Sequence, residues 1–206
     1  MKILTIQYDG DIENPCDMES QWKVYSFGRR HSSYTDPEEF FPNGKPTLAI
    51  RRKLEVGTAF VLSYHEHGAC EWSLQGTGVQ CRWDTVNVAG LLVWEHPLKE
   101  LGPKTLEART KDAAFFLKIY TGWCNGYGYY YRVEEVVKLP CGHTETNIVD
   151  SCGGFYSTDT AYMFEQIREA VGDDQDVKVR GQAGDLTQYH EYKKKPAPAP
   201  TAEEAH

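Results

Sequence analysis

Two groups of residues have the types and spacing of metal ligands. Asp9, Asp11 and Glu13 alternate along an acidic loop, and hard cations such as Ca²⁺ or Mg²⁺ bind several carboxylate oxygens around one point. The spacing is similar to the start of an EF-hand loop, although the glycine and the distal glutamate of that loop are not in their places. A solvated, turn-forming loop is the alternative interpretation.

His65 and His67 form the second group. Residues two apart point to the same side of a strand, so the two imidazoles would lie together, with Cys70 and Glu71 close in the sequence. All of these side chains are zinc ligands. Ordinary polar residues near the tip of a hairpin are the alternative interpretation.

The basic segment formed by Arg29, Arg30 and His31 has the chemistry to bind an anion. Guanidinium groups bind phosphate and carboxylate through two parallel hydrogen bonds. If the carboxylates of Asp84 and Asp150 converged on this segment, the residues would form a site for a small phosphorylated ligand, in an enzyme or a sensor. As an exposed turn of an acidic protein, the segment would instead contact a partner or be solvated.

Cys141, His143, Asp150 and Cys152 are the residue types of a cysteine-dependent active site. The glycines after Cys152 could direct backbone N–H groups toward an oxyanion, but no nucleophile-elbow pattern is present. Packing at a tight turn is the favoured interpretation. The sequence therefore assigns no catalytic residue, favours a non-enzymatic protein, and leads us to expect no cofactor.

Composition restricts the function further. The 206 residues are 40% hydrophobic and 13% aromatic, which is enough for a folded core. The net charge of −8 disfavours nucleic-acid binding through phosphate neutralisation and suits a basic partner. The N-terminus does not resemble a signal peptide, and no apolar run approaches the ~20 residues of a membrane helix, so we expect a cytoplasmic location. The six cysteines form no Cys-x-x-Cys pair, and free buried thiols are the simplest interpretation.

The elements that must position these groups are visible as periodic patterns. The predicted strands are residues 2–8, 22–27, 58–64, 69–74, 86–94 and 127–133, with 86–94 central and a marginal strand within 177–192; the predicted helices are residues 46–56, 103–120 and 159–171. Residues Ala113, Phe116, Leu117 and Tyr120 form the apolar stripe of the longest helix. These patterns predict an α+β fold: one domain over residues 1–192 with a mixed or antiparallel sheet and two main helices, then a disordered Pro/Ala-rich tail at 193–206.

The predicted strand at residues 127–133 is rich in tyrosine. Tyr127, Tyr129, Tyr131 and Val133 alternate along it and share one face. This face either belongs to the core or contacts a partner through Tyr127 and Tyr129, and period two is compatible with both. The glycines of residues 150–156 predict a constrained turn before the last helix.

Several segments, in order, resemble a family of uncharacterised bacteriophage and mobile-element proteins. The matching segments are Tyr8-Asp9 with Glu13-Asn14-Pro15, Gly28 to His31, Trp83-Asp84 leading to Gly90-Leu-Leu-Val93, Tyr127-Gly128-Tyr129, and Asp150 to Tyr156. The resemblance covers most of residues 1–171, and Trp83-Asp84 and Asp150 to Phe155 are its most specific parts. It implies a phage-encoded accessory protein in the cytoplasm of the infected host, and it brings no established catalytic residues.

These observations support three hypotheses. The first is a non-enzymatic binding protein that acts on a host protein through an acidic, aromatic-rich surface, in one version as a nucleic-acid mimic in the basic groove of a host defence enzyme. The second is the enzyme or sensor for a small phosphorylated ligand described above. The third is a minor structural component of the phage. The first is favoured, and none of the three involves a membrane.

Overall fold

The computed structural model describes residues 1–19, 21–172, 177–181 and 183. Its three α-helices and eight strands confirm the α+β class. The chain gathers into two compact units, each with its own four-stranded sheet. Unit 1 consists of Met1–Gly10, Tyr129–Phe155 and the described residues from Asp159 onward, and unit 2 consists of Asp11–Gly128 and Tyr156–Thr158. The predicted tail at 193–206 lies outside the described residues.

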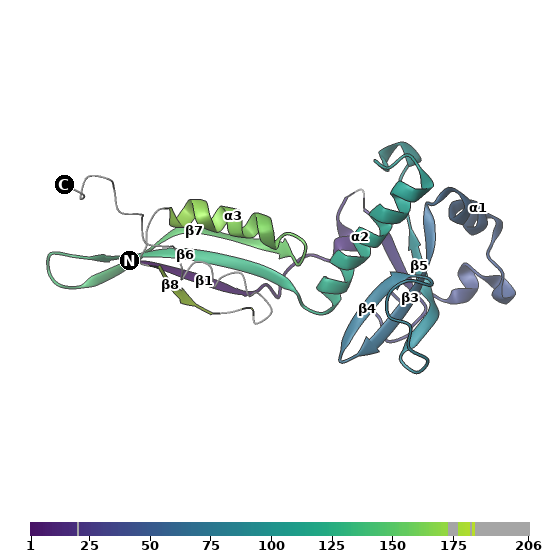
Figure 1. Ribbon diagram of the computed structural model, residues 1–206, viewed down its shortest axis with the longest axis horizontal. Helices are drawn as coiled ribbons and strands as arrows, with labels where there is room; N and C mark the ends of the chain where they lie inside the picture. The colour runs from purple at the N-terminus through teal and green to yellow at the C-terminus, as the bar shows by residue number, and fades with distance from the viewer. Residues whose placement is uncertain (20, 173–176, 182, 184–206) are drawn as a thin grey trace, which may run out of the picture. The chain divides into compact units, whose positions relative to one another are not determined.

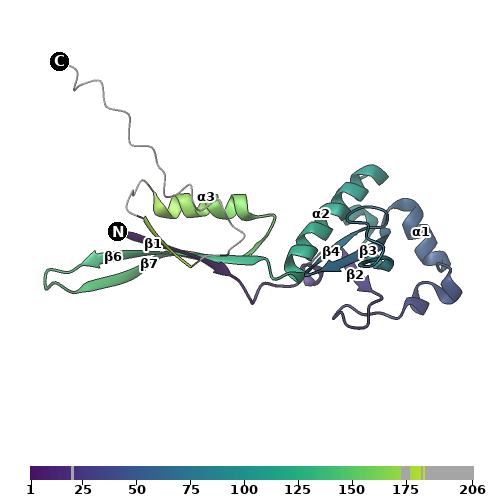
Figure 2. The same ribbon diagram turned by 60° about the horizontal axis from the view of Figure 1, so that its bottom comes forward.

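Unit 1 is a mixed sheet with one helix. The strands, in spatial order, are β7 (Thr144–Tyr156), β6 (Gly128–Lys138), β1 (Lys2–Tyr8) and β8 (Val177–Arg180). Strand β1 pairs antiparallel with β6 and parallel with β8. Helix α3 (Thr160–Val171) lies along one face of this sheet (Figures 1 and 2), and its apolar stripe of Met163, Phe164, Ile167 and Val171 is buried.

The tyrosine-rich face of β6 belongs to the core of unit 1. Tyr129, Tyr131 and Val133 are each at most 1% exposed, and the alternate residues Tyr130 and Arg132 are half-buried. Tyr129 is therefore not accessible to a partner, which corrects its prediction as a surface contact. Alternate residues of β6 point to opposite faces of the sheet, and these rings are on the face that α3 covers. The other face is not covered by α3.

Residues 150–156 do not form the predicted turn, because β7 continues through them to Tyr156. The chain reverses earlier, at 139–143, where Gly142 has a φ of 87° and its N–H donates to Leu139 O. The two glycines of β7, Gly153 and Gly154, instead allow the carboxylate of Asp9 to lie close to the strand. A Cβ on Gly153 would lie 2.8 Å from Asp9 Oδ2, and the N–H of Gly154 donates to that oxygen at 2.9 Å.

Unit 2 is an antiparallel sheet with a helix on each face. The strands, in spatial order, are β2 (Lys23–Ser26), β5 (Thr85–Val93), β3 (Ala59–His67) and β4 (Ala69–Leu74). Strand β5 is interior, as predicted. Its Gly90 is required there, because a Cβ would lie 2.3 Å from the backbone oxygen of Tyr25 on β2.

The two helices of unit 2 start at threonine N-caps. Thr47 caps α1 (Leu48–Val56) and Thr105 caps α2 (Leu106–Cys124). The predicted stripe of α2 is confirmed: Ala113, Phe116, Leu117 and Tyr120 are buried against Trp22, Leu62, Trp72 and Leu92. Ile50 of α1 packs on the opposite face, against Ala59, Leu91 and Val93. Short 3₁₀ segments occur at Pro15–Asp17, Pro37–Glu39, Pro42–Gly44 and Leu98–Glu100.

Candidate functional site

The loop that joins β4 to β5 presents the most exposed large hydrophobic side chain of the described residues. Trp83 is 83% exposed, and the guanidinium of Arg82 lies over its ring at 5.2 Å from the centroid. Val79, Val86 and Val88, on either side of this pair in the chain, are exposed as well. We call these five residues the Trp83 patch. Contiguous exposed apolar and aromatic side chains are typical of binding surfaces.

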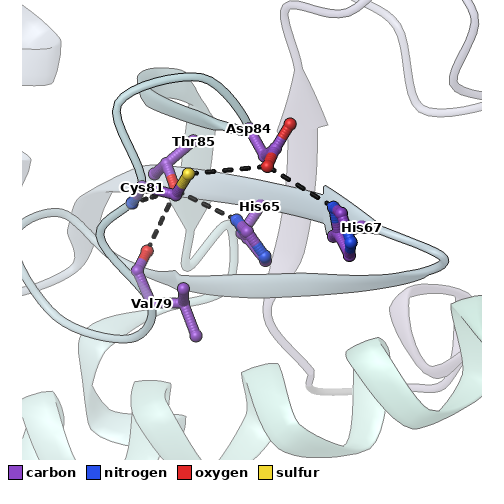
Figure 3. A network of polar contacts seen from close by, with 6 residues as sticks. All are labelled: His65, His67, Val79, Cys81, Asp84 and Thr85. Atoms are coloured by element: carbon purple, nitrogen blue, oxygen red, sulfur yellow. Dashed lines mark hydrogen bonds and ion pairs between the residues drawn. The ribbon is translucent and has the colours of Figure 1, made fainter.

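A network of polar contacts holds the backbone of this loop (Figure 3). The Thr85 hydroxyl donates to Val79 O at 3.1 Å and accepts from the N–H of Cys81 at 2.9 Å. Because its single proton is used on Val79, the contact of 3.1 Å with His65 Nδ1 requires His65 to donate. The Cys81 thiol donates to Asp84 Oδ2 at 3.5 Å. The patch is therefore displayed by an ordered loop.

His67 completes the network through a contact with Asp84, with Nδ1 3.5 Å from Oδ2, which is an ion pair when the imidazole is protonated. Both side chains are accessible to water, so this pair contributes little to stability. The backbone N–H of Glu66 also donates to Asp84 O at 3.1 Å. His65 and His67 thus share one side of β3, as predicted, but they hold the loop rather than a metal.

The structure supports neither predicted metal site. Throughout the described ranges, no three His, Cys, Asp or Glu side chains gather as a metal ion requires. Of the alternating carboxylates, Asp9 accepts a hydrogen bond from the Gly154 N–H at 2.9 Å. Glu13 uses its backbone oxygen to accept from the hydroxyl of Tyr156 at 2.8 Å.

A pocket of about 350 Å³ lies between the end of α2 and the sheet of unit 2. Aromatic rings form much of its wall, and the ring centroids of Tyr64 and Trp72 are 4.7 Å apart. Two thiols and an amide also line it. The lining residues are His31, Ser32, Tyr64, Glu66, Gly68, Cys70, Trp72, Tyr120, Trp123, Cys124 and Asn125. Concave pockets that combine aromatic rings with a few polar groups are the usual form of small-molecule sites.

His31 separates from the two arginines of the basic segment and joins this pocket. Its ring lies 4.7 Å from Tyr64 and 5.3 Å from Trp72, and Nδ1 is 2.6 Å from Ser26 Oγ. Nε2 is buried and has no hydrogen-bond partner within the described part of the chain. Burial lowers the pKa of His31, and the nearby charge of Arg30 lowers it further. The ring is therefore neutral at pH 7.

Arg29 and Arg30 are exposed, and Arg30 forms an ion pair with Glu66 on β3. The carboxylates of Asp84 and Asp150 each have a partner of their own. Asp84 belongs to the Trp83 loop, and Asp150 of unit 1 accepts from the hydroxyl of Tyr131 at 2.6 Å. Neither of them lines the pocket that contains His31. The pocket around His31 therefore does not include the two carboxylates of the predicted phosphate site.

Asn125, directly after α2, binds both backbone groups of Cys70 on β4. Its Oδ1 accepts from Cys70 N at 2.9 Å and its Nδ2 donates to Cys70 O at 2.8 Å. The thiols of Cys70 and Cys124 both line the pocket, and each is the main influence on the other: Cys124 lowers the pKa of Cys70, and Cys70 raises the pKa of Cys124. All six cysteines are free, but only Cys16 is buried, so that part of the sequence interpretation is corrected.

Sequence reasoning did not identify Trp83 or the thiol pair as site residues. Trp83 is the easier case, because a tryptophan beside Asp84 in a glycine-rich connector indicates an exposed loop. Cys70 and Cys124 are distant in the chain, and no local spacing connects them. Tyr127, the remaining predicted contact, is half-buried in the turn between α2 and β6.

Comparisons of the chain with protein-family models, with curated proteins and with solved structures found no match. No helix in the described residues has the length and apolarity needed to span a membrane.

Proposed function

We propose that this chain is a protein-binding accessory factor and that Arg82 and Trp83 form the centre of its contact surface. The observation that supports this most directly is a tryptophan that is 83% exposed on a loop fixed by side-chain hydrogen bonds. Tryptophan and arginine are the residues most enriched at binding hot spots. Keeping such a ring in water has no benefit for folding, so its accessibility favours a role in recognition.

The energy available at this position is sufficient for specific binding. Complete burial of a tryptophan removes roughly 200 Å² from water, which corresponds to about 4–5 kcal/mol before the costs of association. The loop network reduces one of those costs, because side chains and backbone that are already ordered lose less entropy when they bind. An ordered loop that carries Trp83, with three exposed valines close to it in the chain, is thus suited to anchor in a hydrophobic groove of a partner.

The wider proposal is that the partner is a host protein and that the chain is encoded by a phage. The resemblance to phage and mobile-element proteins supports it, and Trp83-Asp84 is among the most specific segments of that resemblance. The net charge of −8 favours a partner with a basic surface around the apolar contact. A basic rim would make association faster at low salt, while the tryptophan contact itself would be insensitive to salt.

The test is affinity capture from bacterial host lysate with three forms of the full chain: wild type, Trp83→Ala and Phe115→Ala. Phe115 is an exposed aromatic residue on α2 of the same unit and serves as the matched control. We expect wild type and Phe115→Ala to recover the same partner in near-equal amounts, and Trp83→Ala to bind it at least about 30-fold more weakly, as loss of a hot spot of ~2 kcal/mol requires. Equal binding by Trp83→Ala, or no partner for wild type, would refute the proposal.

A second variant tests the ordered loop separately from the ring. Thr85→Val removes the hydroxyl that connects Val79, Cys81 and His65, and leaves Trp83 in place. We expect intermediate affinity, with a slower association rate because the loop must order on binding. Circular dichroism of each variant verifies that the fold is retained. An affinity equal to that of wild type would show that loop order does not contribute.

A further inference from the structure

The pocket of unit 2 contains a feature that is independent of the Trp83 patch. Two thiols from distant parts of the chain, Cys70 at the start of β4 and Cys124 at the end of α2, line it together, and Asn125, the residue after Cys124, is hydrogen-bonded to the backbone of Cys70. We propose that they form a peroxide-reactive thiol pair, in which Cys70 is oxidised first and Cys124 then closes an intramolecular disulfide. Reactive cysteines of this kind are accessible and lie beside a second, resolving cysteine.

The geometry provides the proximity that the second step needs. Asn125 holds the backbone of Cys70 by two hydrogen bonds of 2.9 and 2.8 Å, and Asn125 directly follows Cys124 in the chain. Thr121, one turn earlier on α2, binds the backbone N–H of Trp72 at 3.0 Å. The helix end and the strand are therefore fixed to each other on both sides of the thiols. The backbone of Cys70 is thereby kept beside the end of the helix that carries Cys124, which is the closeness a disulfide requires.

Electrostatics favour Cys70 as the first thiol to react, and the pocket allows an oxidant to reach it. Cys124 is exposed and Cys70 is half-buried at the pocket wall, so a small hydroperoxide can reach the pair. The hydrogen bond from the Cys124 thiol lowers the pKa of Cys70, with a smaller contribution from Asn125, whereas burial and the charge of Glu66 oppose this. The thiolate is the nucleophile in peroxide reduction.

The reaction balances with a hydroperoxide as the only oxidant. The Cys70 thiolate attacks the terminal oxygen of the hydroperoxide; an S–O bond forms, the O–O bond breaks, and the alkoxide or hydroxide that leaves takes a proton from water. Cys70 is then a sulfenic acid. The Cys124 sulfur attacks that sulfur, an S–S bond forms, and the departing hydroxide combines with the Cys124 proton as water. Two thiols are oxidised by two electrons, and the peroxide is reduced to an alcohol and water.

The chain contains its own comparison thiols. Cys16 is buried, and burial raises its pKa to about 11, so it should not react. Cys141 and Cys152 are exposed in unit 1. They report the reactivity of accessible cysteines outside the pocket.

The test uses the full chain with hydrogen peroxide, intact mass and peptide mapping at successive times. In wild type we expect loss of two hydrogens and a Cys70–Cys124 disulfide that a dithiol reductant reverses, formed at least about tenfold faster than oxidation of Cys141 or Cys152. In Cys124→Ser we expect Cys70 to stop at the sulfenic acid, which dimedone traps. Cys70→Ser should lose the fast reaction, and Cys152→Ser, the matched control, should keep it.

Several results would overturn this assignment. One is equal oxidation rates for Cys70 and Cys152; another is a fast reaction that survives in Cys70→Ser, and a third is a disulfide that joins different cysteines. Tryptophan fluorescence supplies a readout independent of mass, because Trp72 and Trp123 line the same pocket. It should change with the same time course as the disulfide. Serine is close to cysteine in size, and circular dichroism verifies that each variant is folded.

Discussion

Replacing Asn125 with alanine tests how strand β4 is attached to helix α2. Three side-chain hydrogen bonds disappear: the one accepted from Cys70 N at 2.9 Å, the one donated to Cys70 O at 2.8 Å, and the one donated to Thr121 O at 2.9 Å. Each is worth about 0.5–1.5 kcal/mol net, and an unpaired buried group costs more. Asn125 is half-buried, so water replaces part of the loss. We expect the free energy of unfolding of unit 2 to fall by about 2 kcal/mol.

Asparagine is required because its amide supplies an acceptor for the N–H of Cys70 and a donor for the carbonyl of Cys70. Asn125→Asp keeps an acceptor for the Cys70 N–H but directs a carboxylate oxygen at the carbonyls of Cys70 and Thr121. We expect it to destabilise unit 2 at pH 7 at least as much as alanine does. Acidification below about pH 4 should restore part of the stability, because a protonated carboxyl can donate again.

The assay is urea unfolding of the full chain followed by tryptophan fluorescence. All five tryptophans lie in unit 2, so this signal reports that unit alone. The control is Asn87→Ala: Asn87 is exposed on β5 and accepts only one long bond, 3.4 Å from Ser63 Oγ, so its loss should cost less than about 0.5 kcal/mol. A shift for Asn125→Ala as small as that of the control would refute the reasoning.

Two further predictions concern single contacts. Tyr131→Phe removes the hydroxyl that donates to Asp150 at 2.6 Å inside unit 1. Hydrogen bonds to charged groups are worth about 1.5–3 kcal/mol, and water near the half-buried Asp150 should reduce the loss of stability to about 1–2 kcal/mol. Hydrogen exchange of β6 measures this loss, and removal of the more accessible hydroxyl of Tyr130 is the control. His31→Gln should make the stability of unit 2 less sensitive to acid. Because burial, and after it Arg30, hold the pKa of His31 below 6.5 in the folded chain, the unfolded chain binds the proton first, so stability is complete above pH 6.5 and decreases as the pH falls below it. Fluorescence-monitored unfolding of both proteins at about pH 7.5 and about pH 5 measures the difference, and parallel losses would contradict it.

Local sequence patterns predicted most of the elements because the signals are themselves local. The stripe of Ala113, Phe116, Leu117 and Tyr120 follows helical spacing, and all four residues are buried. The alternation of tyrosines in β6 correctly predicted a strand with one distinct face, and the structure assigns that face to the core. Strand β5 was expected to be central from its hydrophobicity, and it has a neighbour on each side.

The errors arise where a pattern has more than one physical cause. Glycines at 153 and 154 indicated a turn, but a glycine in a strand equally allows a neighbouring group to come close, and here that group is the carboxylate of Asp9. The spacing of His65 and His67 places two imidazoles on one side of a strand, as a zinc site requires. Only the fold shows that the Nδ1 atom of His65 contacts Thr85 and that the Nδ1 atom of His67 contacts Asp84. The division of the strands between two sheets has no local signal, because pairing depends on residues far apart in the chain.

The Asn125 variant also connects the stability of unit 2 with its thiol chemistry. If Asn125 positions Cys70 beside Cys124, then Asn125→Ala should slow closure of the disulfide more than it slows the first oxidation of Cys70, and sulfenic acid should accumulate in a chain that still contains both cysteines. Lower stability alone would expose all the thiols and accelerate their oxidation without selectivity. A dimedone-trapping experiment distinguishes the two outcomes, because the first labels Cys70 selectively and the second labels all the thiols. Accumulation at Cys70, with Cys141 and Cys152 unchanged, would therefore establish that the amide positions the pair.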